Sequence, residues 1–428
     1  MSSSPVIDDR PEIAALRDRI DPDARDVVAR LREAGHEAYL VGGCVRDLLL
    51  GLPPKDFDLA TSAHPSEIRM LLRNCRLIGR RFRLAHIYFR GGKIIETATF
   101  RANPLEEMDE PPADLLLSQD NVFGTAEQDA RRRDFTVNGM FYEPESGRVI
   151  DYVGGLEDLQ RRTLRLIGDP SVRIQEDPVR ILRAARFAAR LSFDVGPRTY
   201  DAMRSHVQGL QRCATARLVE EIQRLVHCGA ARRAVDLAIE VGAIGVLLPE
   251  LGQALESRPE ARSALMAMLH SYDAARARGY LGSNALAWSL LVLPLTRGLE
   301  ESEQLTWIHD VLQSIGERLK TPKRDRETVE TLGTLVAELG RRPRTERAAR
   351  ALVRRAAFGE ALVLRTLELH AAGQPLGEIG EWKAIARNLG VAIEALPGAP
   401  RPGERAAARS RSHRGGRRPR GGRGAQRS

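Results

Sequence analysis

The sequence predicts an α+β head with a small mixed β-sheet, followed by an all-α neck and body and a basic tail. Short apolar strands alternate with helical segments over residues 36–168. From about Leu191 onwards, apolar residues recur at helical spacing and are interrupted mainly by Gly and Pro. The tail contains Gly, Pro, Ser and Arg but few apolar residues beyond alanine, so it cannot form a core.

The chain has 428 residues, enough for two or three domains of about 150 residues each. We expect five parts: a segment with an entry helix (residues 1–35), the head (36–168), a helical neck (169–260), a helical body (261–397) and a disordered tail (398–428). No apolar run approaches the ~18 residues of a membrane span, and the N-terminus lacks an apolar signal core. We therefore expect a cytoplasmic protein without membrane contacts.

The net charge of +9 is concentrated at the C-terminal end. Residues 401–428 contain ten Arg and one Glu, which gives 10 − 1 = +9, so residues 1–400 are close to neutral. Dense arginine binds phosphate, so the tail resembles an arginine-glycine nucleic-acid segment, with low-complexity drift as the alternative. The four cysteines show neither zinc spacing nor a secretory disulfide context.

The first predicted elements are an irregular segment and a helix. Residues 1–11 are expected to be disordered. Apolar spacing over residues 11–34 predicts a helix that is broken at Asp21-Pro22 and capped by Gly35.

A buried strand at Tyr39 is followed by Gly42-Gly43 and a helical segment that ends near Leu50. Glycines at this point let the backbone approach a phosphate, and the free N–H groups of a helix start can hold it. Arg46 adds a positive charge to that cradle.

Asp56 and Asp58 stand two residues apart on the next predicted strand, so their carboxylates face the same side. Such close like charges repel, and a bound divalent cation would keep both ionised. Carboxylates without nearby Cys or His favour a hard ion, Mg²⁺, with Mn²⁺ as an alternative. Each motif alone also fits an ordinary turn or loop; their combined order is far more specific.

After the Asp-x-Asp strand, the chain is predicted to form a helix, a hairpin, a loop and two further helices, the last of them in the neck. The helix ends near Arg73, and the hairpin joins residues 84–89 to 93–100 across Gly91-Gly92. Glu96 on the second hairpin strand is a candidate third carboxylate; pairing with Arg101 or Lys93 is the alternative. Residues 101–120 are expected to form a mobile surface loop, followed by a helix over residues 126–133.

The second of these helices is predicted to begin with Asp177 as N-cap and Pro178 at its first position. Arg180, Arg183 and Arg186 then recur every three residues along one flank.

These motifs together resemble the head domain of the polymerase β-like nucleotidyltransferases, the group that includes tRNA CCA-adding enzymes and bacterial poly(A) polymerases. The resemblance rests on G-G-x-V-R-D followed by D-x-D, on R-R-D-F-T-x-N at Arg132 to Asn138, and on E-D-P-x-R-x-L-R-x-x-R-F at Glu176 to Phe187.

The resemblance implies a role for each candidate residue. Asp56 and Asp58 would hold the metal ions, with Asp134 as third catalytic acid. Asp177 and Arg180, joined by a salt bridge, would read the incoming base. The remaining nucleotide-binding residues would be Gly42, Gly43, Arg46, Arg133, Arg183 and Arg186. The resemblance also implies that the neck reads the base and binds RNA, and that the body binds RNA.

The implied activity is addition of AMP from ATP to the 3′ ends of mRNA and other transcripts, with RNA-decay proteins as further partners. Residues 74–86 and the following IIETATFR resemble the poly(A) polymerase signature, which favours that branch over CCA addition. A non-catalytic RNA-binding protein is the third alternative, and the intact Asp56–Asp58 pair argues against it.

Overall fold

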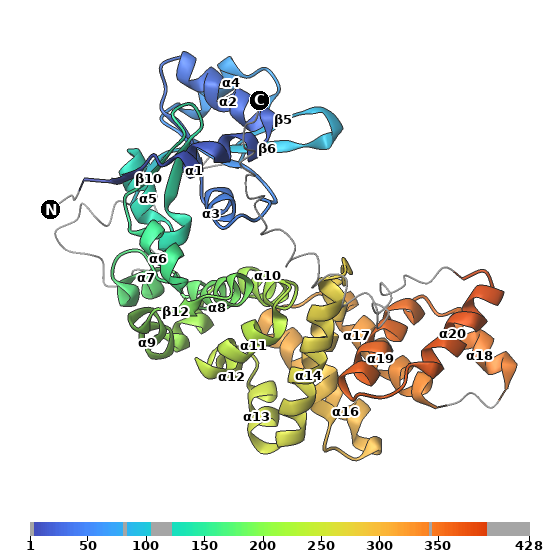
Figure 1. Cartoon of the computed structure of the whole chain (residues 1–428). Coiled ribbons are helices and arrows are strands. Elements are labelled where there is room, and N and C mark those ends of the chain that lie inside the picture. The colour runs from blue at the N-terminus through green and yellow to red at the C-terminus, as the bar shows by residue number, and fades with distance from the viewer. Residues whose placement is uncertain (1–3, 80–83, 104–121, 342–344, 392–428) are drawn as a thin grey trace, which may run out of the picture.

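The computed structural model describes residues 4–79, 84–103, 122–341 and 345–391. The basic tail and most of the loop predicted at residues 101–120 lie outside the described residues. A head that carries the sheet lies above one end of a long helical arm, which Figure 1 shows running from green to red. The predicted α+β head with an all-α body is confirmed.

The head is built on an eight-stranded mixed sheet in the order β1-β10-β9-β2-β3-β6-β5-β4. Strands β3 and β6 run parallel, and their other neighbours in this sheet pair antiparallel. The strands are β1 (Val6–Asp8), β2 (Ala38–Val41), β3 (Asp58–Thr61), β4 (Cys75–Ile78), β5 (Leu84–Tyr88), β6 (Ile94–Thr99), β9 (Met140–Glu143) and β10 (Arg148–Asp151). Two small two-stranded sheets are β7 (Arg101–Ala102) with β8 (Val122–Phe123), and β11 (Thr163–Leu164) with β12 (Asp194–Val195).

Successive side chains of β2 point to opposite faces of the sheet, and each face packs into its own apolar cluster. Leu40 points into the larger core, which includes Leu31 of α2, whereas Tyr39 and Val41 point into a second cluster with Phe141. The head helices are α1 (Pro11–Ala14), α2 (Pro22–Glu33), α3 (Gly43–Leu49), α4 (Pro65–Leu71), α5 (Ala126–Arg132) and α6 (Gly155–Arg161). Because Asp58 pairs with Val41, it lies on the face of the second cluster, at the strand end.

The predicted break at Asp21-Pro22 is confirmed. A 3₁₀ turn (Ala15–Arg19) ends before it, and Asp21 caps α2 by accepting a hydrogen bond from the Asp23 amide. Pro22 occupies the first helical position, where the missing N–H costs nothing.

The prediction of disorder over residues 1–11 is wrong for β1 and for the start of α1. Val6–Asp8 forms an edge strand that pairs with β10, Ile7 opposite Ile150. Three residues are too few to show a strand pattern, and the pairing depends on a partner more than 140 positions away. Strand β4 was not predicted either, although it lies within the signature region.

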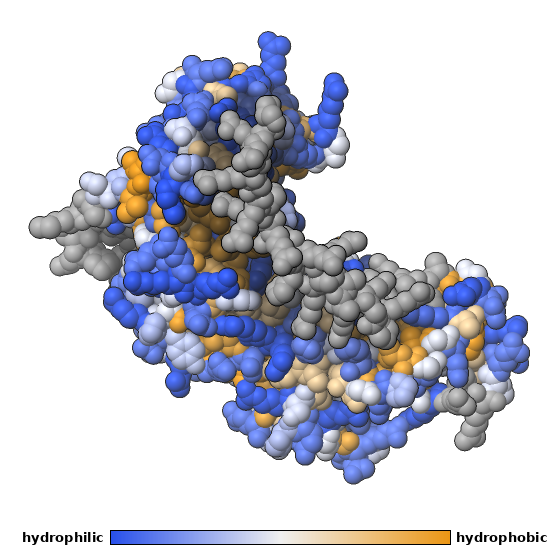
Figure 2. Space-filling model, viewed as in Figure 1, coloured by the Kyte–Doolittle hydropathy of each residue, from blue (hydrophilic) through white to orange (hydrophobic). Residues whose placement is uncertain are grey.

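The arm contains the remaining helices. They are α7 (Pro170–Glu176), α8 (Arg180–Leu191), α9 (Pro197–Ser205), α10 (Thr215–Val226), α11 (Ala231–Glu240), α12 (Ala243–Leu247), α13 (Pro249–Ser257), α14 (Pro259–Arg276), α15 (Asn284–Val292), α16 (Glu301–Leu319), α17 (Lys323–Gly340), α18 (Glu346–Val353), α19 (Phe358–Ala371) and α20 (Gly377–Asn388). Figure 2 shows hydrophilic residues over most of the visible surface and apolar ones in the hollow below the head. In the described part of the chain, no helix is long and apolar enough to span a bilayer.

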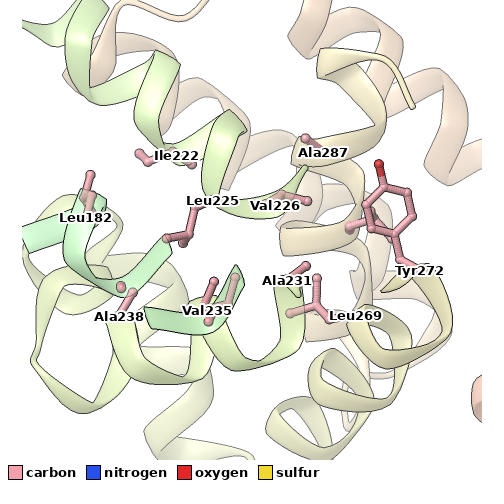
Figure 3. Close-up of a cluster of buried hydrophobic side chains, with 14 of the residues drawn as sticks. Leu182, Ile222, Leu225, Val226, Ala231, Val235, Ala238, Leu269, Tyr272 and Ala287 are labelled. Carbon is pink, nitrogen blue, oxygen red and sulfur yellow. The ribbon is translucent and has the colours of Figure 1, made fainter. Parts of the chain in front are cut away.

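A buried apolar cluster ties the neck helices to the body (Figure 3). Leu182 of α8, Leu225 of α10 and Val235 of α11 meet there, with Leu269 and Tyr272 of α14 on the far side. All five side chains are essentially inaccessible to solvent. This cluster fixes α8 and α10 as one rigid unit.

The predicted N-cap at Asp177 is wrong. Helix α8 begins at Arg180, and a separate helix, α7, ends at Glu176. The Asp-Pro cap signature belongs to Asp169, which accepts hydrogen bonds from the Ser171 and Val172 amides. Asp177 lies between the two helices, so its carboxylate is free to point at a neighbouring helix.

Candidate functional site

The site begins at the glycine turn between β2 and α3. Gly42 has φ +76, a conformation that L side chains rarely adopt. A β-carbon there would also lie 3.0 Å from Nη1 of Arg133. The backbone conformation therefore requires glycine at this position, and the Arg133 guanidinium lies close to the turn.

Three carboxylates converge beside that turn. Asp58 is paired with Val41 on one side and with Glu96 on the other, in the parallel register of β3 and β6. Desolvation by the surrounding chain, with repulsion from Glu96 and Asp56, raises the pKa of Asp58 to about 6, against the lowering effect of Arg133. Burial and the neighbouring acids therefore both disfavour the charged form of Asp58.

The sequence analysis gave pairing of Glu96 with Arg101 or Lys93 as the alternative. In the sheet, Glu96 is paired with neither of them. Lys93 forms an ion pair with Asp21 at 2.8 Å, whereas Glu96 lies 3.6 Å from Nε2 of His86. The prediction that Asp56 lies on the same strand as Asp58 is wrong, because β3 begins at Asp58. Asp56 lies before the strand, is 70% exposed and lies 3.6 Å from Lys55. Among the described residues no three His, Cys, Asp or Glu side chains form a ready metal cluster. The three oxygen donors still fit a hard divalent cation in chemistry and in charge.

A pocket of about 310 Å³ adjoins this row of acids. Its volume is at the lower end of ligand-binding cavities. It is lined by Arg133, Asp134, Asn138, Asp177, Arg180, Arg183 and Arg217. Four guanidinium groups against two carboxylates give a positive pocket suited to an anionic ligand.

Asp134 is held inside this pocket and not among the row of acids. It accepts hydrogen bonds from Arg183 at 2.6 Å and from the Asn138 amide at 3.3 Å. Desolvation alone would raise the pKa of Asp134, but the charge and hydrogen bonds of Arg183, aided by Asn138 and the Phe135 amide, lower it below its usual value. Asp134 is therefore ionised and fully engaged near neutral pH.

The predicted salt bridge between Asp177 and Arg180 is replaced by two other pairs. Oδ2 of Asp177 accepts from Arg217 of α10 at 2.8 Å. Arg180 donates to Glu176 at 3.0 Å and to the backbone carbonyl of Arg173. Both predicted base-reading residues still line the same pocket, each oriented by a different partner.

One atom of this arrangement has no partner. Oδ1 of Asp177 is buried and accepts no hydrogen bond from the described residues. A buried, unpartnered carboxylate oxygen is costly, so such an atom at a pocket wall points to a ligand donor.

Two further predicted nucleotide-binding residues lie outside the pocket lining. Arg46 is 2% exposed, and its guanidinium is bonded to Asp47 and to Asn138. Arg186 donates to Glu221 of α10 at 3.1 Å and lies over the Phe187 ring. These contacts suit residues that hold the pocket wall in place.

The sequence had singled out neither Asn138 nor Arg217 for a role. Asn138 ends the quoted R-R-D-F-T-x-N motif and bridges Arg46 to Asp134, so the motif itself carried a signal. Arg217 stands 40 positions from Asp177, on an amphipathic helix that also carries Arg224, and no local pattern distinguishes it.

Two segments of the chain match profiles of known protein families. Residues 38–165 match the family profile described as "Poly A polymerase head domain", and residues 192–255 match "Probable RNA and SrmB- binding site of polymerase A". The chain belongs to the nucleotidyltransferase family of poly(A) polymerases and CCA-adding enzymes. The Poly(A) polymerase I of Salmonella typhi is 50% identical over 225 residues, 51% of this chain and 48% of that protein. The Haemophilus influenzae protein of the same name is 48% identical over 233 residues, 53% and 51% of the two chains.

CCA-adding members of the family are also similar. The enzyme of Streptococcus uberis is 32% identical over 287 residues, 66% of each chain. The crystal structure of the Bacillus stearothermophilus CCA-adding enzyme in complex with CTP superposes with a TM-score of 0.67 at 26% identity, covering 87% of this chain and 85% of that one. The chain spans about half the length of the poly(A) polymerases that it matches.

Proposed function

We propose that this chain is a template-independent polynucleotide adenylyltransferase, which adds AMP residues from ATP to RNA 3′ ends by two-metal catalysis and so promotes RNA processing and decay. The observation that carries the proposal is the unpartnered Oδ1 of Asp177 in an arginine-rich pocket beside three carboxylates. The pocket offers a base-reading acceptor, and its arginines suit a triphosphate.

The hydrogen-bond donors and acceptors of Asp177 and Arg180 determine which bases the pocket can recognise. Asp177 can only accept, and Arg180 can only donate; among the described residues Arg180 bonds to the protein through Nη1 alone. Such an edge fits a base with an exocyclic amine next to a ring acceptor, which adenine and cytosine both provide. Uracil and guanine present a carbonyl where Asp177 requires a donor. The pair therefore selects ATP or CTP and rejects UTP and GTP.

Sequence relationships favour ATP over CTP. Poly(A) polymerase I relatives are 45–50% identical to this chain, whereas the CCA-adding relatives are 32–37% identical over regions of similar or greater length. The signature at residues 74–86 points to the same branch. CCA addition remains the competing function, because the Asp177–Arg180 edge accepts both bases.

The remaining roles follow from position. Gly42, Gly43 and Arg133 lie at the turn beside the acids and would hold the triphosphate, with Arg183 deeper in the pocket. Asp56, Asp58 and Glu96 would hold Mg²⁺, or Mn²⁺ in its place. When bound, these ions supply activation of the RNA 3′-hydroxyl and stabilisation of the leaving pyrophosphate. Asp134 would orient Arg183, which gives it an electrostatic role.

The deciding experiment uses the full-length chain with two acceptors, an oligo(A) primer and a tRNA lacking its 3′ end. Each is incubated with Mg²⁺ and with ATP, CTP or both, and products are resolved on a gel. We expect ATP alone to extend oligo(A) by many residues and CTP to be used poorly. Addition of C-C-A to the tRNA without extension of oligo(A) would establish the CCA-adding alternative. No addition to either acceptor would support a non-catalytic RNA-binding role.

A further inference from the structure

An ordered row of side chains runs across the open sheet face, away from the nucleotide pocket. In register order, Asp58 of β3 is paired with Glu96 of β6, Glu96 with His86 of β5, and His86 with Arg76 of β4. Paired residues of neighbouring strands share a face, so the four side chains project from one side of the sheet. Figure 1 shows β5 and β6 at the outer edge of the head.

This row lies on the side of β3 opposite the nucleotide pocket. Arg133 lines the pocket, lies close to Gly42 at the end of β2 and lies over the Phe141 ring of β9. The sheet order β9-β2-β3-β6-β5-β4 therefore places the pocket on one side of Asp58 and the row on the other. Phosphoryl transfer requires the attacking oxygen and the leaving pyrophosphate to lie roughly in line. If the triphosphate occupies the β2 side, the 3′-hydroxyl must arrive over β6.

Arg76 is placed to meet the acceptor strand on that approach. It is exposed, and its guanidinium lies 5.4 Å from the centroid of the Tyr88 ring, which holds it over the sheet. Three strand spacings separate the backbones of Arg76 and Asp58, about 14 Å. An arginine side chain covers part of that distance, so it can reach a phosphate within the last few nucleotides of an RNA whose 3′-hydroxyl lies at Asp58.

We propose that Arg76 binds a backbone phosphate near the 3′ end of the RNA acceptor, with Tyr88 as the positioning residue that orients its guanidinium. This rests on the proposed function only in requiring a nucleotidyl transfer at Asp58. It adds an acceptor site to that function and assigns a physical role to Arg76, a basic residue of the 74–86 signature. The contact is to a phosphate, so it does not depend on RNA sequence.

The test compares Arg76→Gln, Tyr88→Leu and Tyr88→Phe with Arg161→Gln as matched control. Arg161 lies on α6 of the head, 67% exposed and paired with Glu157. Arg76→Gln should raise the acceptor KM about tenfold, leave the KM for ATP unchanged, and lower the log–log salt slope of RNA binding by about 0.7. Tyr88→Leu should show part of this loss, and Tyr88→Phe should restore wild-type behaviour because it keeps the ring.

A second RNA acceptor, without phosphate charges near its 3′ end, tests the contact between Arg76 and phosphate by itself. An RNA with neutral methylphosphonates in its last few linkages should bind wild type and Arg76→Gln equally, because the partner charge is gone. Unchanged acceptor KM in Arg76→Gln, or an equal rise in the KM for ATP, would overturn the proposal. Binding is read by fluorescence anisotropy on a 3′-deoxy form of whichever acceptor the wild type extends. Failure of poly(A) addition therefore leaves this test intact.

Discussion

Asp58 and Glu96 are directly paired across the parallel strands β3 and β6. This places a second strand's carboxylate on the same face as Asp58, whereas Asp134 is bonded to Arg183 inside the pocket. Sequence had left open whether Glu96 or Asp134 is the third acid. The pairing favours Glu96 as a metal ligand and Asp134 as an electrostatic anchor of the pocket.

Asp56→Asn and Asp58→Asn should each abolish nucleotide addition while leaving the fold intact. Loss of a metal ligand removes several kcal/mol of transition-state stabilisation. The fold should not suffer, because the substitution relieves repulsion that raises the pKa of Asp58. Activity with Mg²⁺ and the circular dichroism spectrum together check this expectation. Wild-type turnover in either variant would remove these residues from the metal site.

Glu96→Gln and Asp134→Asn should fail in different ways. Glu96→Gln should lower kcat by two orders of magnitude or more with little change in the KM for ATP, because a metal ligand acts on the reacting atoms. Asp134→Asn should raise the KM for ATP more than it lowers kcat, because it loosens Arg183. Steady-state kinetics with saturating RNA separate the two. The reverse pattern would assign the third acid to Asp134.

The pair of Asp134 and Arg183 should make stability depend on pH in a defined direction. The pKa of Asp134 is lowered in the folded state, so its stabilising effect is present above the unfolded value of 3.8 and is lost as pH falls through the folded pKa. Asp134→Asn should cost about 2 kcal/mol at pH 7. The difference in Tm from wild type should be constant between pH 5 and 7 and shrink below about pH 4. A pH-independent difference would mean that packing, and not charge, is lost; Glu157→Gln in an exposed pair is the control.

Deletion of residues 401–428, which lie outside the described structure, should weaken RNA binding without changing which nucleotide is added. Each lost phosphate contact lowers the log–log salt slope by about 0.7 for single strands. The matched control replaces the ten arginines by glutamine at constant length. Equal slopes in wild type and both variants would identify the tail as inert low-complexity sequence.

The sequence predicted the features that residues close together in the chain determine. The break before α2 follows from Asp21-Pro22, and the hairpin of β5 and β6 from two apolar runs around Gly91-Gly92. Features that depend on contacts between segments far apart in the sequence were not predicted. Strand β1 exists because of β10, and Arg217 acquires its role only when α10 packs beside the start of α8.

The same limit explains the errors at the predicted base-reading pair, Asp177 and Arg180. The sequence order E-D-P-x-R suggested that Asp177 and Arg180 bond to each other. With α7 ending at Glu176, that glutamate is the acid within reach of Arg180, so Asp177 pairs across to α10. The start of α8 is thus two residues later than predicted, at Arg180 and not at Pro178, and both residues of the predicted pair have other ion-pair partners.

Arg217 should therefore control which base is accepted, although it does not belong to the motif. It holds Oδ2 of Asp177 and so aims the unpartnered Oδ1 into the pocket. Arg217→Ala should lower the ratio of kcat/KM for ATP over UTP by about tenfold, since one well-placed base contact is worth 1–3 kcal/mol of discrimination.

The measurement is kcat/KM for all four nucleotides on one acceptor, with Arg217→Lys as the conservative variant. Lysine keeps a charge beside Asp177 but loses the planar fork, so partial recovery of the ratio is expected. A phosphate-binding arginine would behave differently, because every nucleotide carries the same triphosphate. Its loss would reduce all four values by the same factor and leave the ratio unchanged, and that outcome would assign Arg217 to the phosphates.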